Sequence, residues 1–302
     1  MHDIVIIGAG PAGLTAALYA LRADKTVLIL EKGTFGGQIT YSPQIENYPG
    51  FAQMSGNEFA DKLVDQVISQ GAELEMETVT AIRDNGTTKT VVTEDGEHEA
   101  KAVIIATGVK HRQTGLAGEN ELVGAGISYC AVCDGAFFKG QTVAVLGGGN
   151  SALQEAVLLS EGCKKVYVIQ NLDYFTGEAK LVEKLKEKDN VEFIMGTVIS
   201  ALHGETELKA LTLKKESDST ESELAVDGLF VAIGLIPQND AFAEIAGLNE
   251  YGYIDSGEDC LTATQGVFVA GDCRSKKIRQ ITTATADGSV AALAACRYID
   301  SL

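Results

Sequence analysis

The stretch "DIVIIGAGPAGLTAALYALRADKTVLILEK" (residues 3–32) reads as an apolar strand, a glycine-rich turn, a helix and a second apolar strand. The turn holds Gly8, Gly10 and Gly13, and the second strand ends at Glu31. Glycines in such a turn let a pyrophosphate approach the backbone at a helix N-terminus, and the acid can accept hydrogen bonds from a ribose. We therefore predict a strand–helix–strand unit that binds a dinucleotide. The alternative is the same unit without a ligand.

The pattern recurs without a gap 139 residues later (147 minus 8), as "TVAVLGGGNSALQEAVLLSEGCKKVYVIQN" (142–171). In this second copy the positions of Gly8, Gly10, Gly13 and Glu31 are taken by Gly147, Gly149, Ala152 and Gln170. The repeat predicts an α/β protein with two Rossmann-like dinucleotide-binding domains.

Three short apolar runs indicate how the two domains are connected. They cover residues 102–108, 228–234 and 266–272, and each ends in glycine or Gly-Asp, as ligand-binding strand ends of such sheets do. We assign the first and third runs to the first domain, so that the second domain is inserted in it. The predicted segments are 1–113 and 241–302 for the first domain and 114–240 for the inserted one, with hinges expected at 115–126 and 237–239.

Composition limits the class of protein. The chain has 302 residues, 45% of them hydrophobic, and a formal net charge of −18. Such a charge disfavours nonspecific binding to nucleic acid and to anionic membranes. No apolar run reaches the roughly 18 residues that a membrane span needs. We expect a cytoplasmic protein that binds neither nucleic acid nor membrane.

The segment "YCAVCD" (129–134) carries the candidate chemistry. A zinc site would need two more Cys or His ligands, and the sequence offers no second pair at ligand spacing, so we expect no metal. In the redox interpretation, Cys130 and Cys133 form a readily reduced disulfide and Asp134 beside them moves a proton. A disulfide exchanges two electrons at a time, which suits a flavin partner. An inert structural pair is the remaining alternative.

These features together resemble the low-molecular-weight thioredoxin reductases over essentially the whole chain. The matching motifs are the first glycine turn, "GGQ" (36–38), "ENYPGF" (46–51), "IIATGVK" (104–110), "YCAVCD", "GGGNSA" (147–152) and "GVFVAGDCRSKKIRQITTATADG" (266–288). The resemblance implies a two-domain FAD enzyme that forms a homodimer and reduces thioredoxin. The inserted domain would carry the redox disulfide.

Residue roles follow from the same resemblance. Cys133 would face the flavin, Cys130 would attack the disulfide of the partner protein, and Asp134 would donate the proton. Asp272 would bind the ribitol. Arg279 and Gln280 would lie near the isoalloxazine, and the alternative is that both are only surface residues after a loop. The residues predicted to bind FAD are Gly8, Gly10, Pro11, Ala12, Gly13, Glu31, Lys32, Gly36, Gly37, Gln38, Asn47, Val79, Ala106, Thr107, Gly108, Gly271, Asp272, Arg279, Gln280 and Ile281.

The second copy departs from the family pattern where NADPH would be recognised. Members that use NADPH carry His-Arg-Arg-x-x-x-Arg there, whereas this chain has Gln170, Asn171, Leu172 and Thr176. Each lost arginine–phosphate contact is worth roughly 1.5 to 3 kcal/mol. The chain resembles in this respect the ferredoxin-dependent flavin thioredoxin reductases, and we predict ferredoxin as the electron donor. A ferredoxin near about −400 mV can reduce a thioredoxin at about −270 mV.

One observation opposes this donor, and other activities stay open. Ferredoxins are commonly acidic, so a chain of charge −18 would repel one unless Arg274, Lys276, Lys277 and Arg279 form a local basic patch. The first alternative is an NADH- or NADPH-dependent thioredoxin reductase. The second is an oxygen-using oxidase of small dithiols, and the third is a non-enzymatic redox sensor or scaffold.

Overall fold

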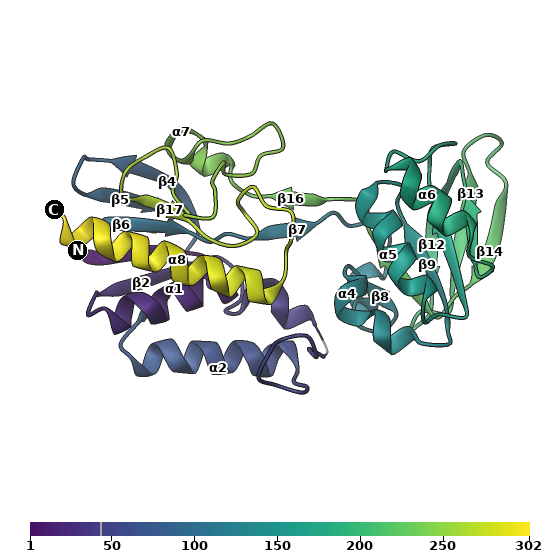
Figure 1. The fold of residues 1–302 in the computed structure, drawn as a ribbon, viewed down its shortest axis with the longest axis horizontal. Coiled ribbons are helices and arrows are strands. Elements are labelled where there is room, and N and C mark those ends of the chain that lie inside the picture. Colours follow the sequence, from purple (N-terminus) through teal and green to yellow (C-terminus); the bar gives the residue numbers. More distant parts are fainter. Residues whose placement is uncertain (43) are drawn as a thin grey trace. The chain divides into compact units, whose positions relative to one another are not determined.

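A computed structural model describes residues 1–42 and 44–302, and the chain divides into two compact units. The first unit contains Met1–Lys110 and Ile236–Leu302, and the second contains His111–Leu235. The predicted boundaries lay at 113/114 and 240/241. The two crossing segments, β7 (Val109–His111) and β16 (Leu235–Pro237), pair with each other in a two-stranded sheet (Figure 1).

The residue after the second crossing explains why the chain rejoins the first unit earlier than predicted. Asn239, placed by sequence in a hinge, is fully buried in the first unit. Its side-chain amide donates to the carbonyl oxygens of Gly252 at 3.0 Å and Cys273 at 2.9 Å. Buried amides need such partners, so this residue is fixed and cannot serve as a hinge.

The first unit is built on a mixed sheet of order β3-β2-β1-β6-β5-β4, with β17 also paired to β6. The β1, β2, β3, β6 and β17 pairings are parallel, whereas β4 and β5 are joined to the sheet in antiparallel fashion. Its strands are β1 (His2–Ile7), β2 (Val27–Glu31), β3 (Glu73–Met76), β4 (Val79–Asp84), β5 (Lys89–Thr93), β6 (Glu97–Ile105) and β17 (Val267–Val269). Its helices are α1 (Pro11–Arg22), α2 (Gly56–Ser69), α7 (Ala243–Ala246) and α8 (Ile281–Asp300), with 3-10 turns η1 (Gly37–Tyr41) and η3 (Asp240–Phe242).

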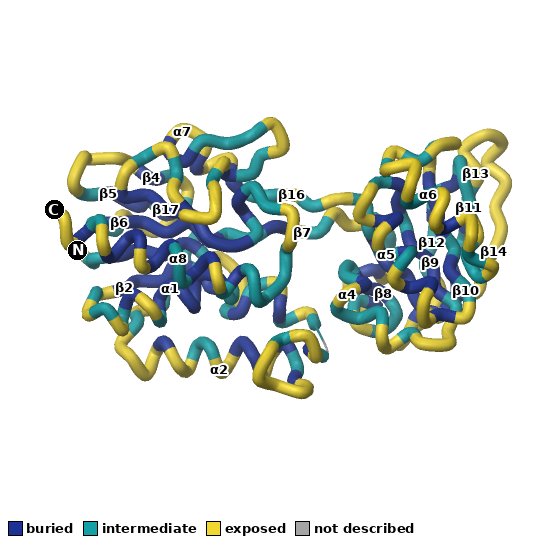
Figure 2. Tube along the Cα trace, viewed as in Figure 1, coloured by how far each residue is buried: buried dark blue, intermediate teal, exposed yellow. Residues whose placement is uncertain are grey.

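Successive side chains of each strand point to opposite faces of this sheet, and residues of other elements pack on both faces. Ile4 and Ile6 of β1 pack in the cluster that includes α1 and α8, while Val5 and Ile7 pack in the cluster on the other face. Figure 2 shows the central strands as buried along most of their length. Helices α1 and α8 are in backbone contact, because a Cβ on Gly288 would lie 2.3 Å from the carbonyl oxygen of Ala12.

The second unit has a parallel sheet of order β11-β10-β9-β15-β8 and a separate antiparallel sheet of order β12-β13-β14. Helices α5 and α6 cover one face of the parallel sheet, and the antiparallel sheet covers the other. The strands are β8 (Ile127–Ser128), β9 (Thr142–Leu146), β10 (Lys165–Ile169), β11 (Val191–Ile194), β12 (Thr197–His203), β13 (Ala210–Lys215), β14 (Glu221–Ala225) and β15 (Gly228–Val231). The helices are α3 (Glu119–Leu122), α4 (Ala131–Asp134), α5 (Asn150–Ser160) and α6 (Ala179–Lys186), with the 3-10 turn η2 (Gly135–Phe138).

The predicted fold class is confirmed: two Rossmann-like units are present, the second inserted in the first. The apolar runs at 102–108 and 266–272 supply β6 and β17 of the first unit, and the run at 228–234 supplies β15 of the second. In the part of the chain that the structure describes, no helix is both long enough and apolar enough to span a bilayer.

Candidate functional site

The first glycine turn connects β1 to α1 and has the shape of an anion site. Gly8 adopts φ +107°, and a Cβ on it would lie 2.4 Å from the carbonyl oxygen of Ala106. A Cβ on Gly13 would lie 1.9 Å from the carbonyl oxygen of Gly8, so neither position accepts a side chain. Gly10 caps α1 without a side-chain hydrogen bond from any described residue. The amide groups of the first turn therefore remain available to a phosphate.

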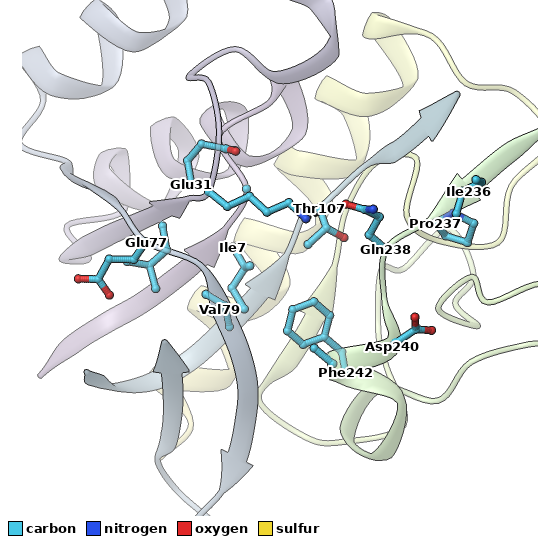
Figure 3. A pocket seen from close by; sticks show the side chains of 14 residues that line it. Ile7, Glu31, Glu77, Val79, Thr107, Ile236, Pro237, Gln238, Asp240 and Phe242 are labelled. Atoms are coloured by element: carbon cyan, nitrogen blue, oxygen red, sulfur yellow. Dashed lines mark hydrogen bonds between the residues drawn. The ribbon is translucent and has the colours of Figure 1, made fainter. Parts of the chain in front are cut away.

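Glu31 ends β2 beside this turn, as predicted. Its carboxylate accepts hydrogen bonds from the backbone N–H groups of Ala9 and Gly33, both at 2.8 Å. A pocket of about 320 Å³ opens next to it, bordered on the far side by Thr107 and Gln238 (Figure 3). The pocket is lined by Ile7, Gly8, Leu30, Glu31, Lys32, Glu77, Val79, Thr107, Ile236, Pro237, Gln238, Asp240, Ala241 and Phe242.

Five of the predicted cofactor residues therefore line one pocket: Gly8, Glu31, Lys32, Val79 and Thr107. The wall of the pocket formed by residues 236–242 was not predicted from the sequence. Lys32 reaches across the pocket and donates a hydrogen bond from Nζ to Oε1 of Gln238 at 2.7 Å. Thr107 donates to Oδ1 of Asn239 at 3.0 Å. Segment 236–242 carries no recognisable motif, and only the return of the chain to the first unit brings it here.

Asp272 follows β17 and has an unusual environment for a carboxylate. Its Oδ1 is buried and has no hydrogen-bond partner among the residues that the structure describes. Burial raises the pKa of Asp272 to about 6, although the positive charges of Lys276 and Arg279 act in the opposite direction. A buried acceptor without a partner is costly, so this atom fits a hydroxyl group of a bound ligand.

The remaining predicted residues of the first unit lie on the loops around these groups. The backbone N–H of Gly36 donates to the carbonyl oxygen of Ala9 at 2.8 Å, which places the loop with Gly36 and Gly37 against the first glycine turn. Asn47 donates to Oε1 of Gln280 at 3.2 Å, and Gln280 forms a capping box at the start of α8. The other predicted positions lie in the first turn of α1 (Pro11, Ala12), after β6 (Ala106, Gly108), in η1 (Gln38), before Asp272 (Gly271) and at the first position of α8 (Ile281).

Two of the four basic residues suggested for a donor-docking patch do not lie at the surface. The side chains of Arg274 and Lys276 are only 2% and 6% exposed, and both are bound to the buried Asp287 at 2.8 Å. Arg279 lies over the ring of Tyr253, with 4.4 Å from Cζ to the ring centroid. Sequence reasoning failed here because a run of basic residues does not show that a buried acid thirteen positions after Arg274 (287 minus 274) neutralises two of them.

In the second unit, Cys130 and Cys133 form a disulfide at the start of α4. The backbone N–H of Cys133 donates to Sγ of Cys130 at 3.2 Å. Ser128 receives a hydrogen bond from the N–H of Cys130 at 3.0 Å and donates to Oδ2 of Asp134 at 2.6 Å. Burial raises the pKa of Asp134, while the hydrogen bond from Ser128 lowers it. An acid with a raised pKa can hold a proton next to a disulfide.

A further acid near the disulfide was not predicted. Glu155 lies on α5, and its Oε2 is buried with no partner in the described part of the chain. The matching position in the first copy (155 minus 139) is Ala16, which is fully buried. Comparing the two copies could have revealed this residue, because an acid at a core position of a repeat is unusual.

The second glycine turn is covered by the side chain of Gln170. This side chain donates from Nε2 to the carbonyl oxygen of Tyr174 at 3.2 Å, and the residue is 5% exposed. A Cβ on Gly148 would lie 2.4 Å from its Cδ, so the amide group of Gln170 rests on the turn. In the first unit the matching Glu31 faces a pocket. In the second unit, the side chain of Gln170 is instead hydrogen-bonded to the loop that follows it.

That loop also folds over the start of α5. The backbone N–H groups of Thr176 and Gly177 donate to the carbonyl oxygen of Gly148 at 2.9 and 3.0 Å. A Cβ on Gly177 would lie 2.9 Å from the backbone nitrogen of Asn150, the first residue of α5. The positions where NADPH-dependent relatives carry arginine include the exposed Asn171 and Thr176.

A glycine turn that leaves room for a phosphate, a disulfide beside an acid, and an Asp272 oxygen with no partner among the described residues are the features expected of a flavin-dependent disulfide oxidoreductase. The chain matches the family model described as pyridine nucleotide-disulphide oxidoreductase over residues 2–288, and it belongs to that family. It therefore binds FAD, as thioredoxin reductases of this family do, and the site of the first unit fits that group.

The relatives make the class more specific. A protein named thioredoxin reductase from Listeria innocua is 40% identical over 303 residues, which is 100% of this chain and 95% of that protein. A Clostridium pasteurianum protein named "34.2 kDa protein in rubredoxin operon" is 41% identical over 298 residues, 98% of this chain and 97% of that protein. The crystal structure of thioredoxin reductase from Streptococcus pyogenes matches with a TM-score of 0.96 at 38% identity, covering 100% of this chain and 99% of that one.

Proposed function

We propose that the chain is an FAD-dependent thioredoxin reductase whose electron donor is ferredoxin and not a nicotinamide nucleotide. The likeness to proteins named thioredoxin reductase supports thioredoxin as the substrate. The inward-turned Gln170 supports the choice of donor, and this is the observation on which that choice depends. The relative named for its place in a rubredoxin operon is compatible with an iron protein as donor.

The residues of the first unit have the following proposed roles. The first turn of α1, which begins after Gly10, binds the pyrophosphate, and Glu31 binds the adenosine ribose. Asp272 accepts a hydrogen bond from the ribitol, and Asn47 with Gln280 borders the flavin. The remaining residues of the predicted set line the same path along the first unit. When bound, FAD supplies the carrier that joins one-electron donors to two-electron disulfide chemistry.

The residues of the second unit carry out the disulfide exchange. Cys133 is the thiol that takes electrons from the flavin side, and Cys130 attacks the disulfide of thioredoxin. Asp134 holds and releases the proton, since its pKa is raised and Ser128 fixes its orientation. These roles come from the family resemblance, and the hydrogen bonds around the disulfide are consistent with them.

The donor is tested by flavin absorbance under anaerobic conditions. We expect reduced ferredoxin to bleach the flavin, and added thioredoxin to be reduced, while micromolar NADPH or NADH produces no bleaching. Prompt bleaching by either nucleotide would contradict the proposed donor. Loss of thioredoxin reduction in C133S would support the disulfide as the route of the electrons, and activity retained in that variant would exclude it.

A gain-of-function variant tests whether the missing arginines explain the lost nucleotide site. Asn171 and Thr176 are exposed and Leu172 is half-buried, so the combination N171R, L172R and T176R restores the three arginines of the family pattern without filling the core. Three charge-assisted contacts of roughly 1.5 kcal/mol or more each predict NADPH binding tighter by a factor of about 10³. Titration of flavin reduction with NADPH measures this. A control with arginines at Lys180, Glu183 and Glu187, which are exposed on α6 and just after it, should gain nothing.

A nicotinamide-linked thioredoxin reductase is the second candidate, since one observation favours it. Gly147 and Gly149 are retained, and no described side chain caps α5 at Gly149, so a phosphate-binding helix start persists. Flavin bleaching by NADH that is strengthened in Q170E, whose acid matches Glu31, would favour this candidate. The expected cytoplasmic homodimer also remains a proposal from the resemblance, and sedimentation of the FAD-loaded protein checks its dimeric state.

A further inference from the structure

Helix α5 presents Glu155 on the face that packs against the disulfide segment. Ala152, Ala156 and Leu159 of this face belong to the same buried cluster as Ala131, which lies between the two cysteines. A Cβ on Gly135 would lie 3.1 Å from Cδ2 of Leu159, so the chain just after the redox motif rests on α5. Glu155 is one helical turn before Leu159 and faces the same way.

Two carboxyl oxygens in this region are buried without a partner among the described residues. One is Oδ1 of Asp134, and the other is Oε2 of Glu155. The second oxygen of Asp134 is bound by Ser128, and the backbone N–H of Ala131 interacts with Glu155. Two carboxyl groups can stay buried in this way only if they carry a proton part of the time, because an unpaired buried charge is costly. Acids of this kind are concentrated at functional sites.

The pKa of Glu155 depends on its burial and on two neighbouring groups. Burial raises the pKa of Glu155 to about 7, the Ala131 amide lowers it, and the charge of Asp134 raises it further. The Cys163 thiol, whose own pKa is raised by burial, lies in the same apolar cluster. Other charges on the elements that pack against α5 are exposed or already paired: Lys180, Glu183, Lys184 and Lys186 of α6, and Lys165 of β10 with Glu192. Asp134 is therefore the charge that couples to Glu155.

We propose that Glu155 is a positioning residue that is coupled through its charge to Asp134 and restores the proton of Asp134 after each transfer to the redox cysteines. This inference rests on the proposed function. In the reductive half, the S–S bond of Cys130 and Cys133 breaks and accepts two electrons from the reduced flavin. The two sulfurs take up two protons, one from Asp134 and one from solvent, and two thiols result. Glu155 then protonates Asp134 and is itself protonated from solvent.

The test isolates this step from both the donor and thioredoxin. The FAD-loaded protein is reduced with dithiothreitol, samples are quenched by alkylation, and the rate of thiol formation is followed between pH 5.5 and 8.5. The ratio of wild-type to variant rates cancels the ionisation of dithiothreitol itself. We expect the E155Q rate to fall about 10-fold at pH 7, within the range that general acid catalysis supplies, and the inflection near pH 7 to disappear.

Two further variants complete the design. E161Q removes an exposed acid at the end of the same helix and should behave as the wild type. E155D keeps a carboxyl group, so its plot of rate against pH should keep an inflection, at a different pH from that of the wild type. A wild-type profile in E155Q, or no inflection in E155D, would overturn the inference. If the rate of thiol formation depends on pH and on Glu155 as expected but thioredoxin is not reduced, the proposed function would be contradicted and the inference would stand.

Discussion

At the scale of single residues, Asp272 shows a conflict between stability and binding. Its pKa is raised from 3.8 to about 6, so between these values the native apoprotein binds more protons than the unfolded chain. The free energy of unfolding therefore falls as pH rises from 4 to 6. Asp272 then costs on the order of 3 kcal/mol at pH 7.

This gives a prediction that differs between the apoprotein and the FAD-loaded protein. D272N should raise the melting temperature of the apoprotein at pH 7.5 and leave it nearly unchanged at pH 4. In the FAD-loaded protein it should weaken flavin binding about 10-fold or more, because a charged acceptor is lost, so the rise in melting temperature should be clearly smaller than in the apoprotein. Thermal unfolding of both forms at the two pH values measures this. Equal shifts in apoprotein and loaded protein would show that Asp272 does not contact the cofactor.

Glu31 was predictable because it ends the strand that follows a glycine-rich turn, and Asp272 because it stands in the motif "GVFVAGD" of the family that the chain resembles. For Gln170, the sequence shows that the acid of the first copy is missing, but it does not show that the side-chain amide turns inward. Glu155 was missed for a different reason. An acid inside a helix ordinarily faces solvent, and only the packing of α4 on α5 shows that this one does not.

At the scale of elements, the contact between α1 and α8 holds the phosphate-binding helix in place. Gly288 of α8 lies against the backbone of α1, and a methyl group there would come within 2.3 Å of the Ala12 carbonyl oxygen. We expect G288A to force the two helices apart and to cost roughly 1 to 3 kcal/mol, as overpacking does. Urea unfolding measures the loss, and FAD should dissociate more readily. S289A on the same helix is the control, and equal effects in both variants would contradict the argument.

The elements themselves were largely predictable, whereas their ends and partners were not. The apolar runs that became β6, β15 and β17 are strong signals because they are short, β-branched and bounded by glycine. The segment 237–239 reads as a hinge by composition alone. Its assignment to the first unit depends on hydrogen bonds from Asn239 to residues 13 and 34 positions away, and no local pattern encodes them.

At the scale of the whole molecule, net charge governs the encounter with a donor. The chain carries a formal net charge of −18, and two of the basic side chains that could have offset it locally, Arg274 and Lys276, are buried against Asp287. Long-range forces on an acidic ferredoxin are therefore repulsive. Repulsion between exposed charges weakens as the Debye length falls from about 10 Å at 0.1 M salt to about 3 Å at 1 M.

The proposed donor thus implies a particular dependence on salt. The second-order rate constant for flavin reduction by an acidic ferredoxin should rise several-fold between low and high ionic strength, because like charges are screened. Stopped-flow absorbance measures it, and reduction of the disulfide by dithiothreitol, whose reactive thiolate carries a single negative charge, serves as the control that should change much less. A rate that instead falls with salt would mean that a local basic surface, one not formed by Arg274 and Lys276, steers the donor to the flavin. In that case K277E, at the exposed lysine of the same segment, should slow the reaction most at low salt.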